Sequence, residues 1–197
     1  MNRYYHGVDQ GVYFNSLGQG RAWSGLVSVG LSYDLDQQEV VIDGVQRAYY
    51  TTVRGMSATV SCFDFPQNFG EAIGVRKVSS FLEVCHQPRS IFSFGFRSKL
   101  DSSDASSILL YHLVYGARIR PFTETHETYS DDPSPSPMDL ELDTLVLPAL
   151  GQTKIGEVTF RSDEPGADQL VAILFGSVSA DSRLPNVTEI NNILGRS

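Results

Sequence analysis

Residues 39–52 read EVVIDGVQRAYYTT, and the class of the fold follows from them. Two runs rich in β-branched and aromatic side chains flank Asp43 and Gly44. Asp-Gly suits a two-residue type I′ turn, because both central residues of that turn adopt positive φ angles. The stretch therefore predicts a projecting β-hairpin centred on Asp43, with strands at residues 39–42 and 45–52.

The rest of the chain repeats this pattern of short β-prone runs separated by clusters of Gly, Asp, Ser and Pro. Further strands are predicted at residues 11–14, 25–33, 57–63, 91–99, 109–119, 123–129, 138–146 and 155–161. Polar loops are predicted at residues 101–107 and 131–137, and the second of these is too rich in proline to join a ladder. We expect one mainly β domain over residues 1–197, an antiparallel β-sandwich or barrel.

Helical signals gather at the C-terminal end, at about residues 166–195. Asn186 and Glu189 form a capping box that begins a short amphipathic helix, and Gly195 ends this helix. Periodicity alone does not assign residues 167–175 to strand or helix, but the flanking proline and glycine favour a helix. We therefore expect one or two short helices beside the sheet.

Composition and charge exclude several classes of protein. The 197 residues carry a formal net charge of -8, which opposes tight binding to nucleic-acid phosphates or to an anionic membrane. The longest apolar run, residues 170–175, is too short to span a bilayer, and the first residues lack the apolar core of a secretory signal. Cys62 and Cys85 stand in no metal-binding pair and are expected to be buried free thiols in a reducing compartment, with a disulfide as the alternative.

No catalytic, cofactor or metal site is expected from the motifs. The glycines at residues 18–25 enter a strand and not a helix, so they are interpreted as turn residues and not as a phosphate loop. Cys85 stands next to His86, like a nucleophile with its base. However, neighbours on an extended chain point to opposite faces, so the two are not expected to form a catalytic dyad. Trp23 and the tyrosine pairs are expected in the core or an interface, with a stacking platform for bases or sugars as the alternative.

Residues 138–143 read MDLELD, an alternation of apolar and acidic side chains. This period places Met138, Leu140 and Leu142 in the core and the three carboxylates of Asp139, Glu141 and Asp143 on the other face. A strand with one face in water explains the pattern equally well. However, three like charges along one face repel each other, and this segment supplies no compensating charge.

Several blocks, taken in order, resemble the tail tube proteins (major tail proteins) of long-tailed, non-contractile bacteriophages with actinobacterial-type hosts. The blocks span nearly the whole chain. They are GVDQGVYF at residues 7–14, AWSGLVSV at 22–29, FDFP at 63–66 with Phe69, QPR at 87–89, FGFRSK at 94–99, YHLVYGA at 111–117, ILFG at 173–176, DSRLP at 181–185 and EI at 189–190.

The resemblance implies a structural virion protein that is made in the bacterial cytoplasm. Such subunits are β-sandwiches with a flanking helix that form hexameric rings, and the rings stack into a hollow tube for DNA ejection. Expected partners are further copies of the chain, the tape measure protein, the tail terminator and the tail-tip proteins, with DNA only in transit and no membrane. The family offers no catalytic residues, and no cofactor is expected.

Two surfaces are hypothesised from the residues. The acidic side chains of Asp139, Glu141 and Asp143 would line the lumen of the tube. An inter-subunit arm would be formed by Val40, Ile42, Asp43, Gly44, Val45 and Tyr49. The alternatives are another virion part, such as a tail terminator or head-tail connector, and a β-sandwich carbohydrate-binding module; an enzyme is not expected.

Overall fold

The computed structural model describes residues 4–42, 45–80, 82–85, 87–101, 108–121, 137–145, 147–149, 153–177 and 181–196. Strands dominate, as the sequence predicts, and the helices are short. In chain order the elements are β1 (Tyr4–Phe14), β2 (Gly20–Ala22), β3 (Leu26–Ile42), β4 (Val45–Cys62), α1 (Gly70–Ile73), β5 (Arg76–Ser79), β6 (Leu82–Val84), β7 (Phe92–Asp101), β8 (Ile108–Ile119), β9 (Met138–Thr144), β10 (Leu147–Ala149), β11 (Thr153–Ile155), β12 (Glu157–Arg161), α2 (Ala167–Phe175) and α3 (Val187–Leu194).

The main antiparallel sheet has eight strands in the order β2-β1-β7-β8-β9-β4-β3, with β12 paired to β8. β8 pairs with β7 along one edge, and its other edge is shared by β12 and then β9. The change of partner occurs at Gly116, which has a φ of 66°. Just before this glycine, the backbone N–H of Tyr115 donates a hydrogen bond to Gly156 O at 3.0 Å. The carbonyl oxygen of Gly116 itself accepts a hydrogen bond from Leu145 N at 2.8 Å.

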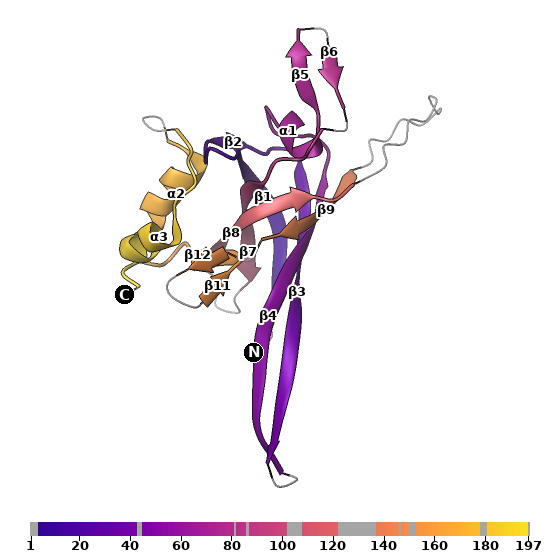
Figure 1. Ribbon diagram of the computed structural model, residues 1–197. Coiled ribbons are helices and arrows are strands. Elements are labelled where there is room, and N and C mark those ends of the chain that lie inside the picture. The colour runs from indigo at the N-terminus through magenta and orange to yellow at the C-terminus, as the bar shows by residue number, and fades with distance from the viewer. Residues whose placement is uncertain are drawn as a thin grey trace, which may run out of the picture.

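The sheet therefore folds over into two packed layers (Figure 1), and an aromatic core lies between them. One layer contains β1, β7 and β8, and the other contains β9, β4 and β3. Phe69, from the loop before α1, lies at the centre of this core, with ring centroids 5.0 Å from Tyr13 and 5.3 Å from Trp23. Trp23 is 1% exposed, which confirms its expected place in the core.

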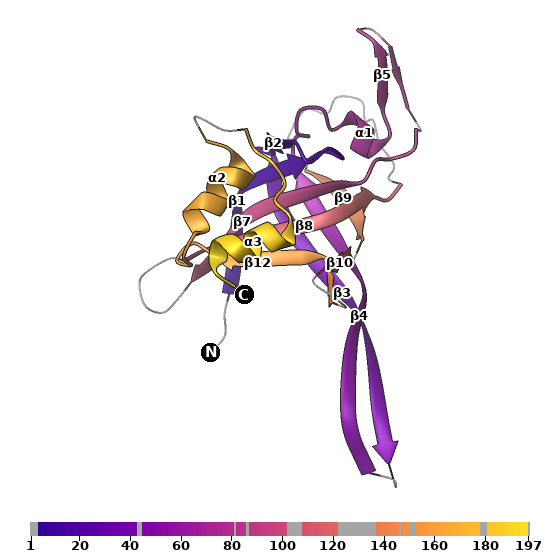
Figure 2. The same cartoon turned by 60° about the vertical axis from the view of Figure 1, so that its left-hand side comes forward.

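The two larger helices cover the outer face of the first layer, as Figure 2 shows. Val12 and Phe14 point to this side and join Leu170, Leu174 and Ile190 in a second apolar cluster. Residues 167–175 are helical, as the flanking residues favoured. Helix α3 begins as predicted, because the Asn186 side chain accepts a hydrogen bond from Glu189 N at 2.8 Å.

Two hairpins project from this body in opposite directions (Figure 1). β3 and β4 form one long hairpin, whereas the sequence predicted two separate strands on each side of the turn. Bulges between Asp34 and Leu35 and between Val40 and Val41 absorb the breaks in alternation, so the ladder continues through them. β5 and β6 form the second hairpin, which the sequence did not predict. Asp43, Gly44 and the predicted strand at 123–129 lie outside the described residues.

Candidate functional site

The acidic strand β9 has the predicted orientation over most of its length. Leu140 and Leu142 are buried at 1% and 0% exposure, whereas the side chains of Glu141 and Asp143 are 66% and 60% exposed. Met138 departs from the prediction, because it is 37% exposed. It is the first residue of the strand, and its ladder partner Cys62 is fully buried, so at this row the core covers β4 and not β9.

The carboxylates belong to a wider surface that we call the polar face. It is the outer side of the layer formed by β3, β4 and β9. Three cross-strand rows define it by register: Ser28 with Ser61 and Asp139, Gly30 with Thr59 and Glu141, and Ser32 with Ser57 and Asp143. Ser61 donates a hydrogen bond to the Asp139 carboxylate. The polar face thus combines small side chains, mostly hydroxyls, with a row of carboxylates.

Arg120, which follows β8, compensates part of this negative charge. Its guanidinium donates from Nε to Asp143 Oδ1 at 2.8 Å and from Nη1 to Glu141 Oε2 at 3.2 Å. The hydrogen bond to Asp143, followed by that to Glu141, raises the pKa of Arg120 above its ordinary value. Arg118 is also exposed and lies directly opposite Asp143 in the ladder. The positive charge that β9 itself lacks is therefore supplied by Arg118 and Arg120, at the end of the neighbouring strand β8 of the same chain.

The predicted arm corresponds to the outer part of the β3–β4 hairpin. The ladder continues through Val40, which pairs with Ala48, to Ile42, which pairs with Val45. Tyr49 pairs with Glu39 in the same ladder, and the turn residues of the arm lie outside the described part of the chain. Within the described residues, β3 pairs with β4 alone. The other edge of β3 joins no ladder there. Its first residues pack beside β1, where Leu26 lies against Gly11, and beyond this contact the edge offers its backbone groups to a further strand.

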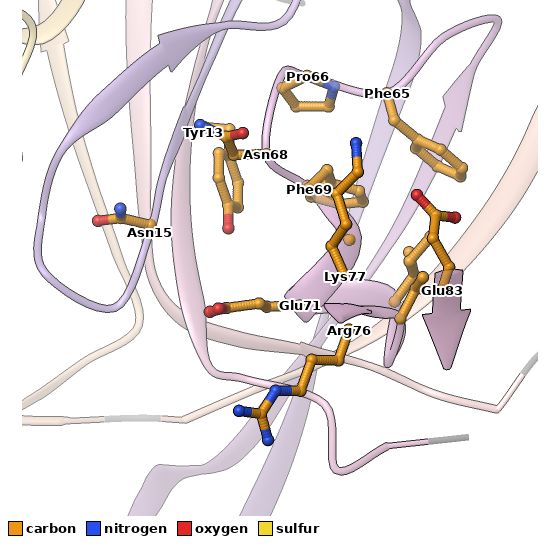
Figure 3. A pocket seen from close by; sticks show the side chains of 13 residues that line it. Tyr13, Asn15, Phe65, Pro66, Asn68, Phe69, Glu71, Arg76, Lys77 and Glu83 are labelled. Atoms are coloured by element: carbon orange, nitrogen blue, oxygen red, sulfur yellow. The ribbon is translucent and has the colours of Figure 1, made fainter. Parts of the chain in front are cut away.

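A cavity that the sequence did not indicate lies at the base of the β5–β6 hairpin (Figure 3). Its volume is about 630 Å³, and it is lined by the stacked rings of Phe65 and Phe69 and by charged side chains that include Lys77 and Glu83. The hairpin above it carries exposed apolar side chains. These are Val78 at 58% exposure, Leu82 at 54% and Val84 at 38%.

The cysteines match the prediction in part. Both are free, and Cys62 is buried, which raises the pKa of its thiol to about 11. Cys85 is exposed, contrary to expectation, because it directly follows the exposed strand β6. Among the described residues no group of His, Cys, Asp and Glu could hold a metal ion, and no helix is long and apolar enough to cross a membrane.

Comparison of the chain with models of known protein families gives no match, and comparison with curated proteins gives no match either. The case for a function therefore rests on the sequence resemblance and on the surfaces described above.

Proposed function

We propose that this chain is the subunit of a bacteriophage tail tube, a structural virion protein that forms hexameric rings stacked into a conduit for DNA. The observation that carries the proposal is the free edge of β3. This strand has 17 residues and therefore extends about 55 Å at roughly 3.3 Å per residue. It runs from the body into a hairpin that projects far beyond it (Figure 1).

A long free edge of this kind favours assembly. Unpaired N–H and C=O groups along a strand pair readily with another chain, so monomeric proteins usually cover or shorten their edges. A closed ring of identical subunits covers every such edge with its neighbour and leaves none for uncontrolled growth. Joining the sheets of successive subunits would produce one continuous barrel around a central channel.

The polar face supports the channel in this arrangement. The other side of the β3–β4–β9 layer packs on the aromatic core, so only the polar face is available to a lumen. The three carboxylates of Asp139, Glu141 and Asp143 outnumber the arginines beside them, of which Arg120 is bonded to two of the carboxylates, and the net charge of -8 repels phosphate. DNA would pass without binding tightly. The tape measure protein would occupy the channel before ejection, and the tail terminator and tail-tip proteins would bind the tube ends.

The carbohydrate-binding alternative receives less support. Such a module needs exposed aromatic rings gathered on a concave surface, whereas Tyr13, Trp23 and Phe69 are each at most 2% exposed. The exposed rings of Tyr33 and Phe63 stand apart, because Tyr33 pairs with Met56, well before Phe63 in the chain. A tail terminator or head-tail connector also forms rings, and the free edge of β3 does not separate these parts from a tube subunit. Stacking of rings into long tubes separates them.

Electron microscopy and native mass spectrometry of the purified full chain test the proposal. We expect rings or tubes, if necessary nucleated by the tape measure protein or the tail-tip complex. Deletion of residues 38–47 should leave a folded subunit that no longer polymerises, because the arm is lost. Deletion of residues 77–83, in the opposite hairpin, is the matched control and should leave the ring intact. A wild-type chain that stays monomeric with a nucleus present, or an arm deletion that assembles normally, would contradict the proposal.

A further inference from the structure

The inner face of the first layer ends in a chain of three polar side chains. Phe92, Phe94 and Phe96 on β7 point into the core, and Ser98 continues their row. Ser98 Oγ lies 3.0 Å from Nε2 of His112 on β8. His112 Nδ1 lies 2.7 Å from Oε1 of Glu157 on β12. Hydroxyl, imidazole and carboxylate thus stand in the order and at the distances of a serine-histidine-acid triad.

The hydrogen bonds fix the direction in which the protons point. Burial alone would raise the pKa of the Glu157 carboxyl, but hydrogen bonds from His112, Tyr33 and Thr159 outweigh it and lower the pKa. The carboxylate is therefore ionised and accepts a hydrogen bond from His112 Nδ1–H. In the tautomer that carries its proton on Nδ1, Nε2 accepts a hydrogen bond from the Ser98 hydroxyl. This is the tautomer that a general base next to a nucleophile requires.

Packing holds the three groups in place. The imidazole of His112 stacks on Phe96 with ring centroids 4.5 Å apart and planes within 5°. The side chains of His112 and Glu157 are only 15% and 12% exposed. Tyr33, on the base of the projecting hairpin, donates its hydroxyl to Glu157 from the opposite layer. The arrangement is pre-organised, which a catalytic group needs because reorganisation adds to the activation barrier.

A cavity of about 360 Å³ opens directly onto the hydroxyl and the imidazole. Apart from the reacting pair, its lining is almost entirely apolar and carries no charged side chain. The other lining residues are Gly7, Val8, Val27, Ser28, Val29, Leu31 and Phe96. The volume lies near the lower end of small-molecule sites. The cavity therefore suits a small, uncharged, aliphatic group.

We propose that Ser98 is a nucleophile and that this cavity hydrolyses small aliphatic acyl esters. Ser98 Oγ bonds to the acyl carbon while His112 Nε2 takes the hydroxyl proton. The ester C–O bond then breaks, and the same proton passes to the leaving alcohol. Water, deprotonated by His112, attacks the acyl-serine; the carboxylic acid departs and the proton returns to Ser98. The net reaction is ester plus water to acid plus alcohol.

The donors assigned to the developing oxyanion are backbone N–H groups of the β1 bulge. β1 and β7 lose their regular register between His6 and Gln10. Gly7, with a φ of 70°, and Val8 lie in this bulge and line the cavity. Backbone N–H groups are common donors of such a site.

A fluorophosphonate probe and p-nitrophenyl butyrate test the proposal on the full chain, as free subunit and in assembled form. We expect covalent labelling that peptide mapping places on Ser98, together with slow ester hydrolysis. Ser98→Ala should abolish both signals. His112→Phe keeps the stack on Phe96 but removes the base, so labelling should fall about 100-fold or more. Ser32→Ala, on the polar face, is the matched control and should react like the wild type.

Mapping the label on the wild-type chain keeps the test decisive if a variant fails to fold. Absence of label on Ser98 in the folded wild type, or equal labelling of His112→Phe, would overturn the proposal and leave the three side chains as a structural hydrogen-bond network. On the free subunit neither result depends on polymerisation, whereas in a tube a neighbouring strand on β3 would border the cavity, whose lining includes Val27, Val29 and Leu31. The outcome is therefore independent of the test of the tail tube.

Discussion

If the polar face lines a DNA channel as proposed, replacing Asp139, Glu141 and Asp143 together by lysine should convert it into a surface that retains DNA. The formal charge of each subunit changes from -8 to -2, because three negative charges become three positive ones. The subunit should still fold, since the side chains of Glu141 and Asp143 are 66% and 60% exposed and lysine would keep its ammonium group in water.

The expected size of the effect follows from counterion release. Each lysine that neutralises a phosphate steepens the dependence of log binding constant on log salt by about 0.9. Three lysines of one subunit therefore predict about a 40-fold loss of DNA affinity between roughly 50 and 200 mM salt. Arg118 and Arg120, released from their acidic neighbours, would add to the attraction.

The assay is co-sedimentation of a fluorescent DNA duplex with assembled tubes at the two salt concentrations. The matched control replaces Asp163, Asp168 and Asp181 by lysine, which gives the same net charge at exposed positions near the helices. We expect DNA retention by the first variant and little by the control or the wild type. In phage, the first variant should form tails and infect poorly.

Equal retention of DNA by the two variants would refute the reasoning, because net charge and not the polar face would then decide binding. Loss of assembly in the first variant alone would refute it in another way. That result would mean that these carboxylates pair with basic groups of a neighbouring subunit. A tube structure that places them away from the channel would end the hypothesis.

Three further predictions concern stability. Leu142→Ala should lower the free energy of unfolding by about 2–5 kcal/mol, measured by urea denaturation, since Leu142 is fully buried; a loss below 1 kcal/mol would show that the site collapses around the smaller side chain. Gly166→Ala should lower the melting temperature, because its Cβ would lie 2.3 Å from Ile193 O at a φ of 81°. Gly195→Ala, with a similar φ but open space around it, should lower the melting temperature less. Equal melting temperatures of the two variants would contradict this. The pKa of Glu157 is lowered in the folded protein, so its carboxylate stabilises the fold above the unfolded pKa near 4.3, and this stability is lost as pH falls through the lower folded pKa. Glu157→Gln should therefore lose less unfolding free energy than the wild type between about pH 6 and 3. Parallel plots of unfolding free energy against pH for the two proteins would argue against the prediction.

Local signals in the sequence predicted the elements that local chemistry determines. The capping box at Asn186 gave the start of α3, and the alternation of residues 138–143 gave the buried face of β9. Propensity and turn residues predicted β7, β8 and the outer part of the β3–β4 hairpin, but not that this hairpin is continuous with the strands of the body. The very short strands β5 and β6 were missed, because three or four exposed residues carry no recognisable period.

Features that depend on pairing between distant strands could not be predicted in the same way. The hydrogen bonds from Arg120 to β9 require the switch of β8 from one partner to another at Gly116. The alignment of Ser98, His112 and Glu157 requires the registers of β7, β8 and β12, in which Phe96 and Thr159 both lie opposite His112. Residue spacing in one sequence does not contain these registers. A list of paired strands would have been enough to find both sites.

The contrast between the β3–β4 hairpin and the body also has a kinetic consequence. The hairpin closes between Ile42 and Val45, whereas the body must bring Ser61 to Asp139 and Phe14 to Ser93. Hairpins form in about 1–10 μs, and pairings that close long loops are much slower. On a newly made chain, the free edge of β3 that is proposed to pair with a neighbouring subunit would therefore form before the core of its own subunit. Correct assembly then requires that the core forms before two chains meet. A low subunit concentration lengthens the time between such encounters and so reduces pairing between incompletely folded chains.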